Sequence, residues 1–346
     1  MTKVYVGMSG GVDSSLTAAL LVEQGYDVTG VYMKNWTEDL PGMKCPWADD
    51  LADAKRVAVQ LGIDFKVFDF ENEYKHKVVD YMIEEYKLGR TPNPDIMCNQ
   101  EVKFKLFLEA ALEDGADMIA TGHYAQVVDG VLKLAADTNK DQTYFLYRVT
   151  GDALRKTLFP LGGYTKPEVR ELAKARGLYT AAKKDSQGIC FVGKIGIREF
   201  LSQYVEQVPG KIIDKKSGHV IGHHDGAIFY TLGQRHGLNL GGGLPYYVVG
   251  KNMDKNEVYV TTDLNDGTLW RETVELTAVH WINNPPVDES RVMIRVRHRA
   301  PLVEATIHLT DGTATLDLAN AERAVAAGQS VVIYSDNVCL GGGIVA

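Results

Sequence analysis

The first half of the chain alternates short apolar stretches with longer segments of helical periodicity. The apolar stretches are residues 3–8, 27–33, 64–70 and 117–124. Their lengths are typical of buried strands. In residues 14–26 and 50–62, apolar side chains recur every three or four positions, and a glycine lies at or near the end of each segment, as at many helix C-termini. Strands that alternate with helices predict a parallel sheet with right-handed crossovers.

The pattern changes after about Gly193. One more helix is predicted over residues 197–207, and from Gly210 onward the chain consists of glycine-rich segments in which apolar and polar residues alternate. Such alternation predicts short, half-buried strands. Asp311 and Gly312 lie between two of these segments and predict a hairpin turn. We therefore expect a small β-rich domain, followed by a further β region that starts near Leu264.

Length and composition narrow the class of protein. The chain has 346 residues, which is too long for one core, so two or three domains are expected. No apolar run approaches the roughly 20 residues of a membrane helix, and the first residues lack a signal-peptide core. We therefore expect a cytoplasmic protein with no membrane partner. A monomer is expected because no heptad pattern is present.

The charge balance bears on nucleic acid as a partner. The formal net charge is -8, which taken alone argues against such a partner. A local basic stripe can still carry binding, and the segment RVMIRVRHR is one. If it is a strand, Arg291, Arg295, Arg297 and Arg299 share one face. That face would form a track for phosphates; the alternative is a solvent-exposed edge strand whose charges prevent aggregation.

The segment SGGVDSS, residues 9–15, lies between a predicted strand and a predicted helix. Unpaired backbone N–H groups and the helix dipole favour a phosphate at such a junction. Gly10 and Gly11 let the backbone approach the anion closely. Further donors are the hydroxyls of Ser9, Ser14 and Ser15. Asp13 suits this position if a metal ion bridges it to the phosphate. The alternative is a glycine-rich turn with an aspartate cap.

The loop lacks the Lys-Ser/Thr ending and the spacing of a Walker A loop. It resembles instead the SGGxDS pyrophosphate loop (PP-loop) of the ATP pyrophosphatases. That resemblance implies that ATP is cut between its α- and β-phosphates and that the substrate is adenylated. It also implies Mg²⁺ bound together with the ATP.

The chain has four cysteines. They are Cys45, Cys98, Cys190 and Cys339. Such a chain is not expected to carry a disulfide framework. Because no Cys-x-x-Cys pair occurs and no histidine pair accompanies the cysteines, the sequence predicts no structural zinc site. Cys45 and Cys339 match nothing catalytic, and both are assigned to packing.

The other two cysteines lie in segments that suit a reactive thiol. Cys98 comes shortly before a helix-like segment, residues 102–113, and a helix N-terminus lowers a thiol pKa. Asp95, three residues earlier, would oppose the thiolate unless it accepts the proton. Cys190 follows a Ser-Gln-Gly stretch and two lysines, which suits a cysteine that receives and delivers a group. The alternative for each is an ordinary buried cysteine.

Together these features resemble the tRNA-specific 2-thiouridylases, the bacterial-type enzymes that thiolate the wobble uridine of tRNA. The resemblance extends over essentially the whole chain. Its landmarks are GMSGGVDSS (7–15), TPNPDIMCNQEVKF (91–104), ATGHYA (120–125), KDQTYFL (140–146), FPLG (159–162), DSQGICF (185–191), YTLGQRHGL (230–238) and CLGGGI (339–344).

The resemblance implies how ATP is held and used. The PP-loop residues are Gly7, Met8, Ser9, Gly10, Gly11, Val12, Asp13 and Ser14. Met33 and Gly122 match positions that line the adenosine. The enzyme would adenylate the uracil O2, which turns this oxygen into a good leaving group for attack by sulfur.

Three residues match the catalytic positions of this family. Cys190 matches the cysteine that carries a persulfide from a sulfur donor protein, Cys98 matches the second catalytic cysteine, and Asp95 matches the general base. Either the persulfide sulfur attacks C2 directly, or Cys98 attacks the persulfide and releases hydrosulfide. Both routes end in a disulfide between the two cysteines, which must then be reduced.

The tRNA contacts implied by the resemblance fall in three segments. Residues matching the stretch that touches the target base are Asn93, Pro94 and Asp95. Other matching contacts are Lys140, Asp141, Gln142, Arg297 and His298. The family often has an aromatic residue where His298 stands, so this position departs from the pattern.

Two other functions stay open on the sequence. An ATP pyrophosphatase with a small-molecule substrate explains the loop but neither Cys98 nor Cys190. A non-enzymatic sulfur carrier or tRNA-binding protein would be expected to have lost Asp13 or the loop serines. The predicted fold is a doubly wound α/β domain of the adenine nucleotide alpha hydrolase-like type (residues 1–195). A small β-rich central domain (196–262) and a tRNA-contacting C-terminal β-barrel (263–346) follow it.

Overall fold

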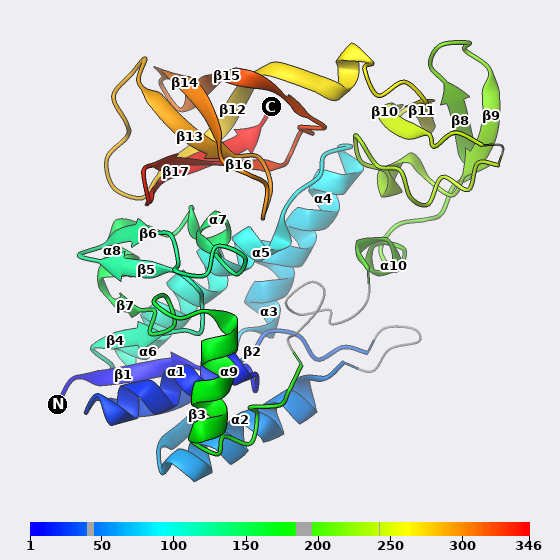
Figure 1. Cartoon of the computed structure of the whole chain (residues 1–346). Helices are drawn as coiled ribbons and strands as arrows, with labels where there is room; N and C mark the ends of the chain where they lie inside the picture. Colours follow the sequence, from blue (N-terminus) through cyan, green and yellow to red (C-terminus); the bar gives the residue numbers. More distant parts are fainter. Residues whose placement is uncertain (40–44, 185–195, 242) are drawn as a thin grey trace.

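In the computed structural model, which describes residues 1–39, 45–184, 196–241 and 243–346, the first domain is built on a five-stranded sheet (Figure 1). Its strands run in the order β3-β2-β1-β4-β7, and every neighbouring pair is parallel. They are β1 (Lys3–Gly7), β2 (Asp27–Lys34), β3 (Asp64–Asp69), β4 (Met118–Ala120) and β7 (Thr157–Leu158). β4 is shorter than predicted, because the chain leaves the sheet at Thr121.

Helices cover both faces of this sheet. Side chains of β1 alternate between the faces: Val4 and Val6 pack in one apolar cluster with residues of α1 and α2, while Tyr5 packs in another with residues of α6. The sheet is therefore doubly wound, as predicted. The helices of the domain are α1 (Val12–Glu23), α2 (Trp47–Leu61), α3 (Glu71–Tyr74), η1 (Lys75–Asp80), α4 (Tyr81–Lys87), α5 (Pro94–Met97), η2 (Cys98–Leu106), α6 (Phe107–Glu113), α7 (Thr143–Leu146), α8 (Gly151–Arg155) and α9 (Lys166–Ala175).

The helix that contains Cys98 begins earlier than the sequence analysis predicts. α5, the π-helical segment η2 and α6 follow one another directly, and the residues at both junctions have right-handed helical dihedrals. The helix starts at Pro94 because Asn93 caps it: the Asn93 side chain accepts hydrogen bonds from two backbone N–H groups of the first turn. Cys98 therefore lies inside the helix, in its second turn.

The chain reverses its direction across the sheet between β1 and β4. β2 neighbours β1 on one side, and β4 neighbours it on the other. Ligands of open α/β sheets bind in the crevice outside the carboxyl ends of the strands at such a switch point. The two loops that leave these strands there are residues 8–11 and 121–124.

The central domain follows α10 (Ile197–Leu201), which is shorter than the predicted helix. Its four-stranded sheet has the order β10-β11-β8-β9. The elements are β8 (Gly210–Asp214), β9 (Val220–His224), the 3-10 turn η3 (Ala227–Phe229), β10 (Tyr247–Asn252) and β11 (Glu257–Thr261).

The C-terminal domain is a closed barrel. Its sheet runs in the order β12-β15-β14-β13-β16-β17, and pairing of β12 with β17 closes it. The domain begins with the 3-10 turn η4 (Gly267–Leu269). Its strands are β12 (Trp270–Trp281), β13 (Arg291–Arg295), β14 (Val303–Thr310), β15 (Thr313–Arg323), β16 (Ser330–Ser335) and β17 (Val338–Val345). Asp311 and Gly312 connect β14 to β15, which confirms the predicted hairpin.

The first domain extends the barrel sheet. The hairpin of β5 (Gln126–Val128) and β6 (Val131–Lys133) adds to β17 through Lys133 and Val338. α7 also contacts the barrel, because the Tyr144 hydroxyl donates to the Ser330 carbonyl over 2.8 Å. Figure 1 shows the barrel against the part of the first domain that carries this hairpin and α7.

The predicted fold class is confirmed: a parallel α/β domain, a β-rich domain and a C-terminal barrel follow one another. Within the described ranges, no helix is long and apolar enough to cross a membrane.

Candidate functional site

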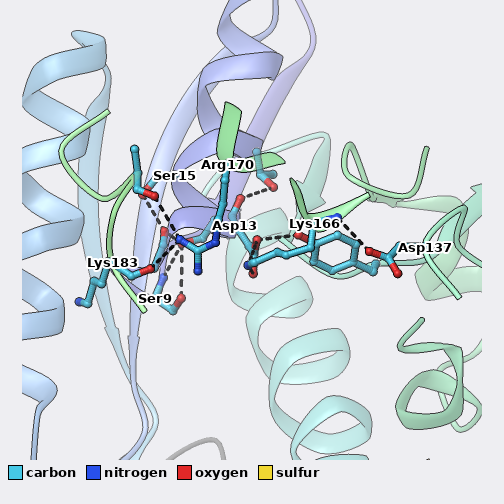
Figure 2. Close-up of polar contacts among 12 residues, drawn as sticks. Ser9, Asp13, Ser15, Asp137, Lys166, Arg170 and Lys183 are labelled. Atoms are coloured by element: carbon cyan, nitrogen blue, oxygen red, sulfur yellow. Dashed lines mark hydrogen bonds and ion pairs between the residues drawn. The ribbon is translucent and has the colours of Figure 1, made fainter. Parts of the chain in front are cut away.

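The loop between β1 and α1 is shaped for close backbone approach (Figure 2). Gly10 has a φ of +70°, and a Cβ atom there would lie 2.3 Å from the carbonyl oxygen of Asp50 in α2. A larger residue would therefore clash with backbone and strain the turn. Gly11 caps α1 without any side-chain hydrogen bond, so the first N–H groups of the helix face the loop.

The loop serines divide into two roles. Ser14 and Ser15 are buried, and their hydroxyls donate to the Gly11 carbonyl over 3.2 and 2.8 Å. The Ser14 oxygen also accepts the backbone N–H of Ser9 over 3.1 Å. Ser9 is exposed. The sequence analysis treats all three hydroxyls as donors to phosphate, whereas here those of Ser14 and Ser15 hold the loop itself together.

Gly7, Met33 and Gly122 come together at the switch point. A Cβ on Gly7 would lie 2.9 Å from the Met33 Cε, and one on Gly122 would lie 2.9 Å from backbone atoms of Asp13 and Ser14. The loop after β4 therefore packs directly against the first turn of α1. The structure thus gathers the loop residues and both residues assigned to adenosine at one edge of the sheet.

Asp13 is held by two side chains from other elements. The ammonium group of Lys166 donates to both carboxylate oxygens, over 2.7 and 2.8 Å, and the Tyr124 hydroxyl donates to Oδ1 over 2.8 Å. Figure 2 shows Lys166 directed at Asp13 from α9. Both oxygens that the sequence analysis offers to a metal thus already accept hydrogen bonds.

The protein supplies few ligands for Mg²⁺ here. Mg²⁺ takes oxygen ligands, typically one or two carboxylates together with phosphates and water. Among the residues that the structure describes, no group of three or more acidic, histidine or cysteine side chains is arranged to hold a metal ion. Because Asp13 is engaged with Lys166, the residues that the structure describes around the loop do not by themselves form a magnesium site.

Lys166 is a residue that the sequence analysis misses. It is the first residue of α9, and the Glu168 carboxylate accepts the Thr165 backbone N–H over 2.7 Å. The spacing of Thr165 and Glu168, with a proline between them, is a helix-start signal visible in the sequence. The signal locates the helix, but it does not show that the lysine faces Asp13, 153 positions earlier.

Asp95 and Cys98 lie on the same helix, three residues apart, so their side chains project to the same side. Cys98 is only 1% exposed, and Asp95 is half-buried. The Asn93 side chain caps this helix: its Oδ1 accepts the N–H groups of Asp95 and Ile96 over 3.1 and 3.3 Å. Pro94 is buried at the first helical position. Cys190 lies outside the described residues.

The helix of Cys98 contacts both neighbouring parts of the site. The Phe104 ring lies 5.5 Å from the ring of His123, in the loop after β4, and the Phe107 ring lies 3.5 Å from where a Gly7 Cβ would be. Burial and the nearby Lys103 hold the pKa of His123 well below its ordinary value, so this imidazole is neutral at physiological pH.

Two segments expected to contact tRNA lie side by side. The Asn99 side chain donates to the Phe145 carbonyl over 3.0 Å, and the Phe145 ring lies 4.5 Å from that of His298. Burial first, then the positive charges of Arg299, Arg295 and Lys140, lower the pKa of His298 to about 4. Phe145 thus lies between the Cys98 helix and His298, and the charge of Lys140 is close enough to act on the His298 ring.

The segment 140–142 is less exposed than its predicted role suggests. Asp141 is 2% exposed, and its carboxylate accepts the Ala135 N–H and the Thr143 hydroxyl over 2.8 and 2.6 Å. The Gln142 Oε1 accepts the Tyr124 N–H over 2.9 Å. In this structure the Asp141 side chain supports the segment from inside and does not face solvent.

The prediction that four arginines share one face of a strand is wrong. β13 ends at Arg295, so Arg297 and Arg299 follow the strand, and Arg299 has a φ of +63°. Arg295 is turned inward and pairs with Asp141 over 3.2 Å. Arg291 is exposed and pairs with Glu304. The strand does not continue because the chain turns over residues 296–299, which leaves Arg297 exposed at the turn.

Cys45 and Cys339 are both buried, as their assignment to packing predicts. Burial raises the pKa of each thiol, which disfavours the nucleophilic thiolate. The Cys45 thiol lies 3.6 Å from the Trp36 carbonyl oxygen.

Family models match three consecutive parts of the chain. They are the tRNA methyl transferase HUP domain over residues 2–194, the tRNA methyl transferase PRC-barrel domain over residues 198–262 and the aminomethyltransferase beta-barrel domain over residues 271–345.

Similar proteins include the tRNA-specific 2-thiouridylase MnmA of Listeria monocytogenes serotype 4b (strain CLIP80459). It is 48% identical over 350 residues, which cover 99% of this chain and 94% of the relative. The protein of the same name from Halalkalibacterium halodurans is 49% identical over 351 residues, with the same two coverages.

Two of the similar solved structures share less sequence with this chain. A 4-thiouridine synthetase in complex with RNA and bound ATP has a TM-score of 0.40 and 21% identity, over 59% of this chain and 50% of that chain. The NMN synthetase from Francisella tularensis has a TM-score of 0.35 and 16% identity, over 54% of this chain and 66% of that chain.

Proposed function

The chain belongs to the tRNA-specific 2-thiouridylase family, and from this membership we propose that it catalyses the ATP-dependent 2-thiolation of the wobble uridine of tRNA. One observation carries the proposal beyond the likeness in sequence. A single helix holds Cys98 in its second turn and contacts the switch point of the sheet through two rings: Phe104 lies against His123 in the loop after β4, and Phe107 lies against Gly7 at the end of β1. A substrate held between them would meet the nucleotide and the thiol together.

The first proposed step activates the base. The uracil O2 attacks the α-phosphorus of ATP, the bond to the β-phosphate oxygen breaks, and pyrophosphate leaves. The N–H groups at the start of α1, the exposed Ser9 and the close backbone of Gly10 hold the phosphates. Met33 and Gly122 line the adenosine. Bound Mg²⁺ would neutralise phosphate charge.

The second proposed step replaces the activated oxygen by sulfur. A donor protein loads Cys190 with a persulfide. In one route its terminal sulfur attacks C2, AMP leaves, and Cys98 attacks the Cys190 sulfur to free the thiolated base. In the other, Cys98 attacks the Cys190 sulfur first, and the released hydrosulfide displaces AMP from C2. Both give 2-thiouridine, AMP and a Cys98–Cys190 disulfide, which an external thiol reduces with two electrons.

Asp95 is the proposed proton acceptor. It lies one helical turn before Cys98 on the same side of the helix, where its carboxylate can take the proton of the Cys98 thiol as the sulfur attacks. A buried thiol is otherwise a poor nucleophile, because burial disfavours the charged form. Asn93 serves this arrangement by fixing the start of the helix.

For tRNA, we propose that Lys140, Arg297 and His298 form one contact surface beside the Cys98 helix. Arg297 is exposed, and the His298 ring packs against Phe145 with an angle of 41° between the ring planes. Base or phosphate groups of the anticodon arm would meet this surface while the target uridine reaches Asn93, Pro94 and Asp95.

The test is sulfur transfer into tRNA. Purified protein is supplied with radiolabelled sulfur from a cysteine desulfurase system, with and without ATP, next to Cys190→Ser and Cys98→Ser. Label in uridine-containing tRNA that needs ATP and both cysteines supports the proposal. Label that does not need ATP indicates a sulfur carrier. Pyrophosphate release with a small substrate and no label in tRNA would refute the thiolase proposal.

A further inference from the structure

We propose that Asp13 serves as the counter-ion of Lys166 and not as a magnesium ligand, and that Lys166 is a positioning residue for the ATP triphosphate. The inference rests on the proposed use of ATP and refines how this chain holds it. It assigns a role to α9, which lies far along the sequence from the loop.

Asp13 and Lys166 form a pair that is complete as it stands. The Lys166 ammonium reaches both oxygens of the Asp13 carboxylate, and the Tyr124 hydroxyl reaches one of them. The ammonium also lies 5.7 Å from the Tyr124 ring centroid, a distance at which a cation is attracted to the ring. A metal ion at Asp13 would have to bind beside the Lys166 ammonium group, and the repulsion between the two cations opposes this.

Lys166 is held in place by a local structure of its own. It is only 8% exposed, and its backbone N–H donates to Asp137 Oδ2 over 2.9 Å. The other oxygen of Asp137 accepts the N–H groups of Asn139 and Lys140 over 3.0 and 3.2 Å. A nearly buried lysine is costly unless its charge is compensated. The fold therefore places this cation beside the loop, with the Asp13 carboxylate as its compensating charge.

The negative charge of Asp13 affects how the loop binds phosphate. Asp13 lies in the first turn of α1, where the partial positive charge of the helix favours an anion. An uncompensated carboxylate there would repel the triphosphate. The Lys166 ammonium cancels that charge, which leaves the N–H groups of the loop effective for phosphate. Mg²⁺ would then be bound by the phosphate oxygens and water.

The two roles of Asp13 predict opposite responses, which ATP binding without tRNA can separate. ATP affinity is measured by isothermal titration calorimetry in EDTA and over a range of Mg²⁺ concentrations. The variants are Lys166→Met, Lys166→Arg, Asp13→Asn and the double variant Asp13→Asn/Lys166→Met. Thermal unfolding of each variant shows whether it is folded.

If Lys166 positions the triphosphate, Lys166→Met weakens ATP binding about tenfold or more, both in EDTA and with Mg²⁺. Asp13→Asn weakens it much less, because the ammonium is released toward the phosphates. The half-saturating Mg²⁺ concentration stays within about twofold in Asp13→Asn, and Lys166→Arg retains most of the affinity. The double variant resembles Lys166→Met.

The inference is overturned if Asp13→Asn raises the half-saturating Mg²⁺ concentration about tenfold while Lys166→Met lowers it, as expected for a metal ligand freed from a competitor. If Lys166→Met does not fold, the Mg²⁺ titration of Asp13→Asn decides alone. A native protein that binds ATP but does not thiolate tRNA would refute the proposed function without touching this inference. No ATP binding by the native protein would refute both.

Discussion

Arg295 of the barrel and Asp141 of the first domain form an ion pair that is almost wholly buried, with 3.2 Å between Nη1 and Oδ1 and only 11% and 2% of the two side chains exposed. The same carboxylate accepts the Thr143 hydroxyl and the Ala135 N–H. The pair therefore joins the domain that holds the Cys98 helix to the domain that holds Arg297 and His298. It therefore links the Cys98 helix to the proposed tRNA contact residues.

Breaking this pair should destabilise the protein. Arg295→Met leaves the Asp141 charge buried without its cation, and removing one partner of such a pair costs about 3–5 kcal/mol. The loss of stability is measured by denaturant unfolding, which is monitored both by a near-UV signal and by a tRNA-binding signal. The matched control is Arg291→Met on the same strand. That residue pairs with Glu304 at the surface, so it should change stability by about 1 kcal/mol or less.

Adding a methyl group at Gly122 should weaken ATP binding. A Cβ there would lie 2.9 Å from backbone atoms of Asp13 and Ser14, so Gly122→Ala must push the loop after β4 away from α1. We expect a loss of about tenfold or more in ATP affinity, since overpacking of this kind costs about 1–3 kcal/mol. Gly163→Ala is the control, because no atom lies within 4 Å of its added Cβ. Equal effects of the two substitutions would contradict the contact.

Removing the helix cap at Asn93 should lower both stability and sulfur transfer. Asn93→Ala loses the acceptor for two N–H groups and should cost about 1 kcal/mol. Asn93→Asp keeps the cap and should keep the stability. Thr150→Ala is the matched control, since Thr150 caps α8 by accepting the Ala153 N–H. It should cost a similar stability and leave the thiolation rate unchanged.

Arg297 should contribute to tRNA affinity through phosphate. We expect Arg297→Ala to weaken tRNA binding at low salt and to reduce the slope of log affinity against log salt concentration by about 0.7–0.9, the value for one phosphate contact. Filter binding at several salt concentrations measures it. Arg291→Ala, which removes another exposed arginine but one that lies on strand β13, should leave the slope unchanged. A slope that Arg297→Ala does not alter would remove this residue from the contact surface.

His298 should make the protein less stable in acid. Its pKa is lowered to about 4 in the fold from an ordinary value of 6.5, chiefly by burial. The unfolded chain therefore binds the proton more readily, and stability is lost as the pH falls from about 6.5 toward 4. His298→Phe keeps a ring against Phe145 and removes this proton. From pH 7.5 to pH 5, the variant should lose about 2 kcal/mol less than the native protein in denaturant unfolding. A difference that does not vary with pH would contradict the lowered pKa.

Local features of the site could be predicted because neighbours in sequence create them. The strand, loop and helix over residues 3–23 follow from apolar periodicity and from the glycines that the turn requires. The separation of Asp95 and Cys98 by three positions is visible in the sequence, although the helix that places them on one side was not predicted there. The start of that helix was missed because the cap of Asn93 was not weighed, although Asn-Pro is visible in the sequence.

The remainder depends on contacts between distant segments. The sequence by itself determined the family, the order of the three domains and the residue types available to the chemistry. Only the tertiary structure decided that Asp13 faces Lys166, 153 positions away, and that Arg295 turns inward to Asp141, 154 positions away. The periodicity of a strand tells which side chains alternate, but not which face another domain will cover. A buried charge is costly unless it is paired. Whether it is paired depends on packing between elements that the local sequence does not encode.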